Sequence, residues 1–143
     1  NDLSTGAVPQ EIASYIQTHT DINYVFESFN GLDTGVSKAL QSAGLGKVKI
    51  VGSQEGAPQL QEIIAGTEAA WTALPQELAM WTIADQMARV AVNQWSASDE
   101  RQSAVPPFYI ISTPAQAQAI VNFKDGWPGP TGFQDAFKKL WGV

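Results

Sequence analysis

The chain has 143 residues, the length of one domain, and its fourteen acidic residues against eight basic ones give a net charge of −6. The basic residues are scattered, which argues against a nucleic-acid groove, and no apolar run is long enough to span a bilayer. The absence of cysteine excludes disulfides, thiolate zinc sites and a cysteine nucleophile.

The first half of the chain alternates helical segments with short β-branched runs. Val8, Ile12 and Ile16 have helical spacing around Pro9, a residue favoured at the first helical position. Later helices end in glycines suited to a left-handed cap. The predicted helices are residues 8–19, 31–43 and 58–65, and the predicted strands are residues 23–28, 47–52 and 67–72. Strand, loop and helix in repeated order predict parallel strands with right-handed crossovers.

The second half begins with a longer helix, predicted for residues 76–95. Its apolar residues lie on two sides, because Leu78 and Trp81 belong to one stripe and Met80 and Met87 to another. Such a helix needs packing partners on both sides. Residues 108–112 are then predicted as a strand or hinge segment, and residues 113–121 and 133–141 as helices. The whole pattern predicts an α/β fold, a Rossmann-like or flavodoxin-like parallel sheet with helices on both faces.

Polar and aromatic residues follow the predicted strands, at the edge where an open parallel sheet binds ligands. Phe29 and Asn30 follow the first strand, Gln54 and Glu55 follow the second, and Trp71 in the third is a weaker candidate. Amides, a carboxylate and flat aromatic faces suit a polyhydroxylated ligand such as a sugar. Other roles stay open, since Asn30 could cap the next helix, Gln54 could satisfy turn amides and Trp71 could be a core residue.

The sequence predicts no catalytic residue, metal site or cofactor. His19 ends the first predicted helix, where a solvated side chain is the expected state. Glu55, Glu62 and Glu68 could supply an acid–base pair, but Glu62 on a helix face and Glu68 at a strand start fit solvated charges better. Because no nucleophile–base pair or phosphate loop is found, we predict a binding protein and no enzyme.

Several segments have an order and spacing that belong together. Residues 24–30 and 35–44 form a strand and a helix that ends in Ala-Leu-Gln-Ser-Ala-Gly. Residues 48–58, Val-Lys-Ile-Val-Gly-Ser-Gln-Glu-Gly-Ala-Pro, and residues 63–75, Ile-Ile-Ala-Gly through Trp-Thr-Ala-Leu-Pro, follow, and the chain closes on Phe-Lys-Lys-Leu-Trp-Gly. Together these segments resemble the C-terminal portion of type I periplasmic (solute) binding proteins, in the ribose- and galactose-binding class that serves sugar ABC importers.

The resemblance implies a protein of two lobes. Residues 1–143 would form the later part of the C-terminal lobe, and residues 76–105 would be the helix and hinge region that packs on the missing N-terminal lobe. The family has a hinge-edge amide that falls on Ala73 or Leu74 here, and neither side chain can form a hydrogen bond. This departs from the family's pattern for an ordinary pentose or hexose site, and the identity of the ligand stays open.

The same resemblance places the family's ligand residues on two loops. The ligand Asn or Asp after the first strand falls on Phe29 or Asn30, and the ligand Asp of the second loop falls on Gln54 or Glu55. These are the residues that follow the strands in the pattern above.

The implied function is that of a substrate-binding component of a bacterial ABC importer, which takes up a small polar solute by hinge closure. Its partners would be a carbohydrate-like ligand and a membrane permease, without nucleic acid, in the periplasm or on the outer surface of the cell membrane. The alternative is the effector-binding domain of a lactose-repressor-type regulator, which the tail from Pro106 to Val143 disfavours. The chain lacks an initial methionine and a leader, so the residues upstream of Asn1 would decide. In isolation, the chain is expected to dimerise through the helix at 76–95.

Overall fold

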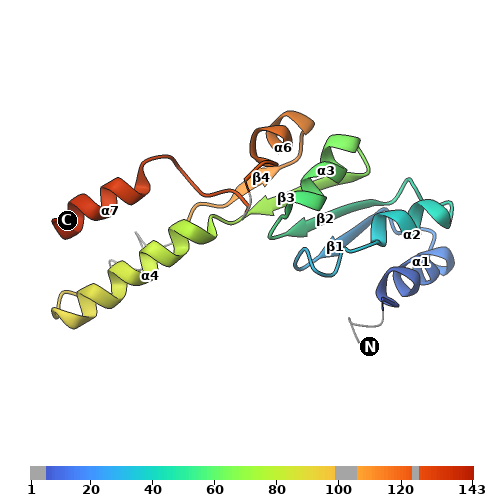
Figure 1. Ribbon diagram of the computed structural model, residues 1–143. Coiled ribbons are helices and arrows are strands. Elements are labelled where there is room, and N and C mark those ends of the chain that lie inside the picture. Colours follow the sequence, from blue (N-terminus) through green and yellow to red (C-terminus); the bar gives the residue numbers. More distant parts are fainter. Residues whose placement is uncertain (1–5, 99–105, 124–125) are drawn as a thin grey trace.

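The computed structural model describes residues 6–98, 106–123 and 126–143, and shows an α/β unit from which a pair of helices projects (Figure 1). Among the described residues, no helix has both the length and the hydrophobicity needed to cross a membrane. The elements are α1 (Val8–Thr18), β1 (Tyr24–Glu27), α2 (Val36–Ser42), β2 (Lys49–Ser53), α3 (Ala57–Ala65), β3 (Glu68–Ala73), α4 (Gln76–Ala91), β4 (Tyr109–Ile111), α6 (Pro114–Ile120) and α7 (Phe133–Trp141).

The four strands form one sheet in the order β1-β2-β3-β4. β1 and β2 are parallel, as are β2 and β3, which confirms the parallel arrangement predicted for these three strands. β4 runs antiparallel to β3 and places Tyr109 opposite Ala73. The segment predicted as a strand or hinge at 108–112 is therefore an edge strand that begins beside the end of β3.

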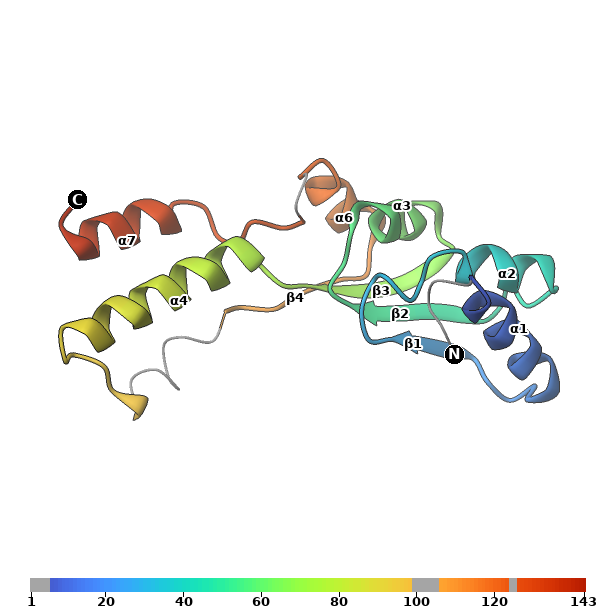
Figure 2. The same ribbon diagram turned by 60° about the horizontal axis from the view of Figure 1, so that its bottom comes forward.

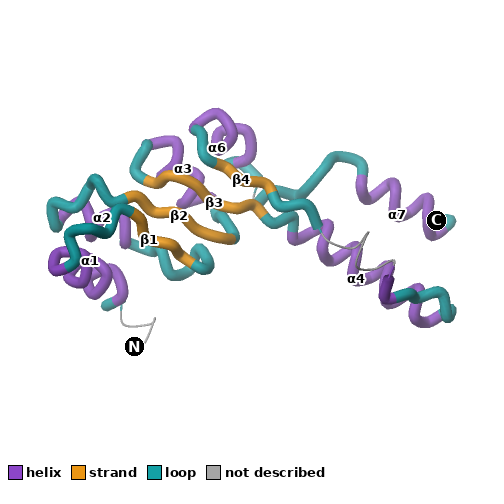
Figure 3. The backbone as a smooth tube through the Cα atoms, turned by 180° about the vertical axis from the view of Figure 1, so that it is seen from behind, coloured by secondary structure: helices purple, strands orange, loops and turns teal. Residues whose placement is uncertain are grey.

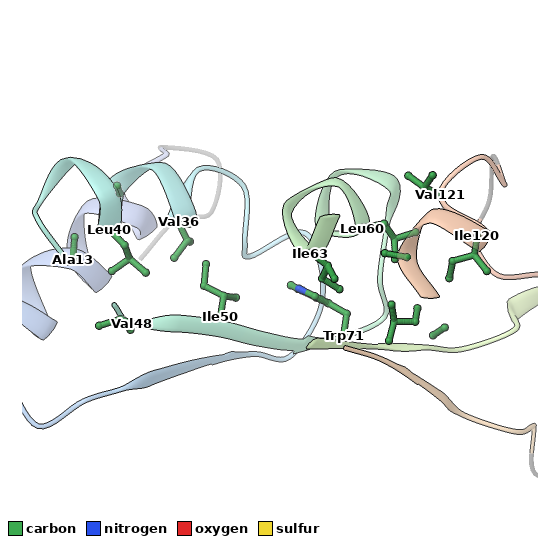
Figure 4. Packing of buried hydrophobic residues seen from close by; sticks show 14 of the residues in the cluster. Ala13, Val36, Leu40, Val48, Ile50, Leu60, Ile63, Trp71, Ile120 and Val121 are labelled. Atoms are coloured by element: carbon green, nitrogen blue, oxygen red, sulfur yellow. The ribbon is translucent and has the colours of Figure 1, made fainter. Parts of the chain in front are cut away.

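The helices of the α/β unit all lie on one face of the sheet, which differs from the prediction of helices on both faces. Figure 4 shows side chains from α1, α2, α3 and α6 on the same side of the sheet as Ile50 and Trp71, and together they form one core cluster. The reason is topological. Strands β1, β2 and β3 are added in one direction, and right-handed crossovers made in one direction place α2 and α3 on the same face.

The opposite face of the sheet carries no helix of the described ranges and has exposed apolar residues on its two edge strands. Tyr24 and Phe26 of β1 are 64% and 68% exposed, and Ile110 of β4 is 62% exposed. These side chains alternate along their strands with inward-facing ones, as the two-residue period of a strand requires.

Three helices have boundaries that differ from the predictions. The helix predicted at 31–43 begins at Val36, because residues 30–35 form turns in which the Val36 N–H donates to the Asp33 carbonyl (2.9 Å). The helix predicted to reach about residue 95 ends at Ala91, where Asn93 has a left-handed φ of 56°. α6 is shorter than predicted at its C-terminal end and starts with a capping box between Thr113 and Gln116.

The helix pair α4 and α7 projects from the end of the sheet, both in the view turned by 60° and in the view from behind (Figures 2 and 3). The two helices pack through aromatic rings, with Trp81 stacked on Trp141 at a centroid distance of 5.3 Å. The indole N–H of Trp141 also donates to Asp85 (2.9 Å), whose second oxygen pairs with Arg89 (2.7 Å). Neither helix has a buried residue, so this pair depends on a single seam.

α4 presents a second apolar stripe away from α7, as its sequence predicted. Met80, Ile83, Met87 and Val90 are 47–68% exposed and recur at spacings of three and four residues along one side of the helix. Nothing described in the chain covers this stripe. We call these four residues the α4 stripe.

Candidate ligand-binding edge

The loops that follow β1 and β2 lie side by side at the carboxyl edge of the sheet. Glu27 at the end of β1 pairs with Gly52 of β2, so both chains leave the sheet at the same edge. A methyl group at Gly56 would lie 3.0 Å from the amide nitrogen of Asn30. The side-chain N–H of Gln59 donates to the Asn30 carbonyl (3.3 Å). The parallel pairing thus brings together the two loops that carry four of the predicted site residues.

Phe29 and Asn30 occupy the first loop in different ways. The ring of Phe29 folds over Gly31, where any side chain would clash with it, and remains 38% exposed. Asn30 is half-buried and lines a cavity of about 410 Å³ that opens between α2 and α3. Both residues therefore have surface that a ligand at this edge could contact.

Gln54 and Glu55 of the second loop have opposite environments. Gln54 is exposed and has a φ of 61°, a left-handed conformation uncommon for a residue other than glycine. Glu55 is buried, and its carboxylate accepts a hydrogen bond from the backbone N–H of Trp127 (3.0 Å). Burial raises the pKa of Glu55, and hydrogen bonds from backbone N–H groups, that of Trp127 foremost, partly offset this effect. The exposed Gln54 side chain can contact a ligand, whereas the Glu55 carboxylate connects its own loop to the segment at Trp127.

Trp71, predicted as a weaker contact, is instead a core residue. Its side chain is fully buried on the helix-covered face, and its ring lies against Gly52, where an added Cβ would come within 2.5 Å of it. Its indole N–H donates to the carboxylate of Glu68. No face of the ring is available to stack on a sugar, so the core alternative considered for this residue is the one found.

A cluster of buried carboxylates behind the edge was missed by sequence reasoning. Glu27, Asp33 and Glu68 are only 4–5% exposed, and each has one oxygen with no hydrogen-bond donor among the described residues. Glu68 was expected to be solvated, but its position in β3 turns it toward the core beside Trp71. The two-residue period of a strand could have indicated the burial of Glu27, because Glu27 follows the inward-facing Val25 by two positions in β1.

Glu62 lies at the other end of the cavity and is partly buried. Its carboxylate accepts hydrogen bonds from Ser37 (3.3 Å) and from Thr67, so it is not the free surface charge that its helix position predicted. His19 is exposed as expected, and its ring stacks on Tyr15 at 3.9 Å.

Three segments of the described chain join the α/β unit to the α4–α7 pair, and they meet at the carboxyl end of β3. The first is the connection from Ala73 to α4, and the second enters β4 at Tyr109, opposite Ala73. The third passes through Trp127 and Gly129, where an added Cβ on Gly129 would lie 3.0 Å from Pro75. The rings of Tyr109 and Trp127 are 5.4 Å apart and link the second and third segments.

The described residues offer no group of three or more His, Asp or Glu side chains arranged to hold a metal ion. The edge instead offers the amides of Asn30 and Gln54, the ring of Phe29 and a polar cavity. Such an arrangement can form hydrogen bonds with a neutral polar ligand and can stack on its apolar face.

Comparisons with known proteins support the fold. No protein-family model matches the chain, and no curated protein matches it. A solved structure of a protein from Mycobacterium smegmatis is similar, with a TM-score of 0.56 and 17% sequence identity. The similarity covers 95% of this chain and 41% of that one, so the chain spans about two fifths of the length of the protein it matches. Likeness at this identity concerns the fold, and this chain has a Rossmann-like α/β fold.

Proposed function

We propose that this chain is part of a two-lobed solute-binding protein of the type I periplasmic class and that it takes a small polar solute, a sugar or sugar-like molecule, for an ABC importer. Residues 1–143 would be the later part of the C-terminal lobe. The solute would bind at the carboxyl edge between the loops of Phe29–Asn30 and Gln54, and a second lobe would close over it. The membrane permease that recognises the closed form would be the partner, outside the cytoplasm.

The observation that carries this proposal is the meeting of the three connecting segments beside the ligand-binding edge. Segments that converge at one end of a sheet can bend together while the elements on either side keep their packing, which is how hinge closure works. The third segment is tied to the site loop itself, because Trp127 donates to Glu55 (3.0 Å). A change in the hinge angle would therefore move the loop that contacts the solute.

The α4 stripe supports the second lobe. Four large apolar side chains, 47–68% exposed along one helix, form a larger patch than monomeric proteins usually leave in water. In the proposed protein, α4 would pack on the N-terminal lobe through this stripe. The helix pair extends away from the α/β unit, which leaves the α4 stripe accessible to such a partner (Figure 1).

The site favours a neutral solute with several hydroxyl groups. Asn30 and Gln54 each supply a donor and an acceptor through their side-chain amides, and Phe29 supplies a flat apolar surface. The only carboxylate predicted at the edge, Glu55, is engaged with Trp127 and is buried. Glu55 therefore offers no free carboxylate to a ligand at this edge.

The test is binding by the natural full-length protein against a panel of pentoses, hexoses and sugar alcohols, first by thermal shift and then by calorimetry. We expect one panel member to bind and Asn30→Ala to weaken it by about 1–3 kcal/mol, the cost of losing one buried hydrogen-bonding partner. Gln61→Ala, an exposed substitution on α3, is the matched control and should bind normally. Unchanged affinity in both Asn30→Ala and Gln54→Ala would show that the site is elsewhere.

A further inference from the structure

Buried polar side chains lie between β3 and the loop that carries Asn30. The indole N–H of Trp71 donates to one oxygen of Glu68. The other Glu68 oxygen and one oxygen of Asp33 have no donor among the described residues, and both residues are buried in the lining of the same cavity. The second oxygen of Asp33 accepts from the Gln59 side-chain N–H (3.0 Å), and the same nitrogen donates to the Asn30 carbonyl (3.3 Å). The Gln59 side chain of α3 is therefore bonded both to the candidate ligand loop and to Asp33, which lines the same cavity as Glu68 of β3.

A hydrogen bond between Asp33 and Glu68 would require a proton on one of the two carboxyl groups. Asp33 and Glu68 are about 95% buried, and each has an oxygen that receives no hydrogen from a described donor. Two ionised carboxylates can only accept hydrogen bonds, so they cannot bond to each other. If one of them carries a proton, its O–H donates to the other and the repulsion between two buried charges disappears.

We propose that Asp33 and Glu68 share one proton in the folded protein, and that this carboxyl pair, through Gln59, is a positioning device for the Asn30 loop. The positioning role rests on the proposed solute-binding function. The shared proton does not, because it concerns the folded state with or without a ligand.

The charges around the pair favour proton uptake. Burial, followed by the charge of Asp33, raises the pKa of Glu68 to about 8. Glu27 of β1 faces the same space, and its pKa is also raised by burial and by Asp33. Glu62 of α3 adds a third negative charge that raises the pKa of Glu68. Lys38 of α2 lines the cavity and is exposed, so solvent weakens its opposing effect.

The direction of the pH effect follows from these pKa shifts. A glutamate in the unfolded chain loses its proton near pH 4.5, whereas folded Glu68 keeps it until about pH 8. Between these values the folded state holds one proton more than the unfolded state, so stability falls as the pH rises. One such proton increases the unfolding equilibrium constant about tenfold per pH unit.

The experiment is urea denaturation of the 143-residue chain at several pH values between about 5 and 8, for wild type, Glu68→Gln and Glu62→Gln. Glutamine at position 68 imitates the protonated carboxyl, because its N–H₂ can donate to Asp33 while its oxygen accepts from Trp71. In wild type we expect the unfolding equilibrium constant to increase about tenfold per pH unit, and in Glu68→Gln we expect this increase to be absent. Glu62→Gln, in the same cavity, should keep most of the slope.

A second readout connects the proton to the loop. The Asn30 backbone amide, followed by NMR, should titrate near pH 8 in wild type and should not titrate there in Glu68→Gln. Asp33→Asn serves the same purpose if Glu68→Gln does not fold. A wild-type slope that Glu68→Gln leaves unchanged would overturn the shared proton. Loss of the slope without an Asn30 titration would overturn the positioning role alone, and solute binding is tested separately.

Discussion

The carboxylate of Glu55 accepts a hydrogen bond from the backbone N–H of Trp127, at 3.0 Å and across 72 positions of sequence. This bond ties the loop after β2 to the third segment that joins the α/β unit to the α4–α7 pair. Gly126 passes equally close, since an added Cβ there would lie 3.1 Å from the same carboxylate oxygen. Glu55, which the sequence suggested as a ligand contact, thus hydrogen-bonds the site loop to the proposed hinge segment.

Removing this hydrogen bond should destabilise the protein. Glu55→Ala leaves the partly buried N–H of Trp127 without its acceptor, which should cost about 1–3 kcal/mol in the free energy of unfolding. Glu55→Gln keeps an acceptor oxygen in place and should cost less. Urea denaturation of both variants checks this expectation. Equal losses in the two variants would mean that the hydrogen bond contributes nothing beyond the packing of the side chain.

The left-handed backbone of Gln54 should carry a measurable strain. A residue with a Cβ pays about 1 kcal/mol or more at φ 61°, and glycine does not. Gln54→Gly should therefore keep or raise the melting temperature while it weakens solute binding through loss of the amide. Gln54→Val should lower the melting temperature, because a β-branched side chain tolerates this φ least. A glycine variant that is less stable than wild type would contradict the strain.

The ring of Trp71 fills the space in the core that a side chain at position 52 would occupy. An added methyl at Gly52 would lie 2.5 Å from the Trp71 ring, so Gly52→Ala should destabilise by about 1–3 kcal/mol through overpacking. Adding Trp71→Leu should recover part of that loss, because the smaller side chain leaves room for the methyl. A double-mutant cycle measures the coupling. Additive effects of the two changes would contradict the close contact.

The α4 stripe should cause the isolated chain to associate. Sedimentation of the 143-residue chain is expected to show a concentration-dependent dimer, because Met80 and Met87 are 60% and 68% exposed on one side of α4. Met80→Gln with Met87→Gln should shift the chain to monomer without lowering its melting temperature, since neither side chain is buried. A monomer for the unmodified chain at all concentrations would contradict this expectation.

The sequence predicted much of the fold because local patterns determine it. β-Branched runs and glycine caps located β1, β2 and β3 and the helices between them, and the parallel pairing follows from the crossovers. The coverage of one sheet face was not predicted, because it depends on the direction in which successive strands are added. Local rules also placed α2 too early, since the turns before Val36 depend on Asp33 folding inward.

The site was predicted less completely than the fold, for a physical reason. Sequence order can place Asn30 and Gln54 at the same edge, and the structure brings their loops together. It cannot show that Glu55 meets Trp127 from 72 positions away, or that Trp71 and Glu68 turn into the core. Those outcomes depend on tertiary contacts and on the strand register, which no short pattern encodes.

The most direct test of the proposed function is small-angle X-ray scattering of the natural full-length protein with and without the panel solute that binds it. Closure of two lobes predicts a smaller radius of gyration on addition of solute to wild type and to the Gln61→Ala control. At a concentration that does not saturate the weaker site, Asn30→Ala should show little of that change. Saturating binding by wild type with no change in the radius of gyration would contradict hinge closure, and the failure of every panel member to bind would contradict the proposed sugar site.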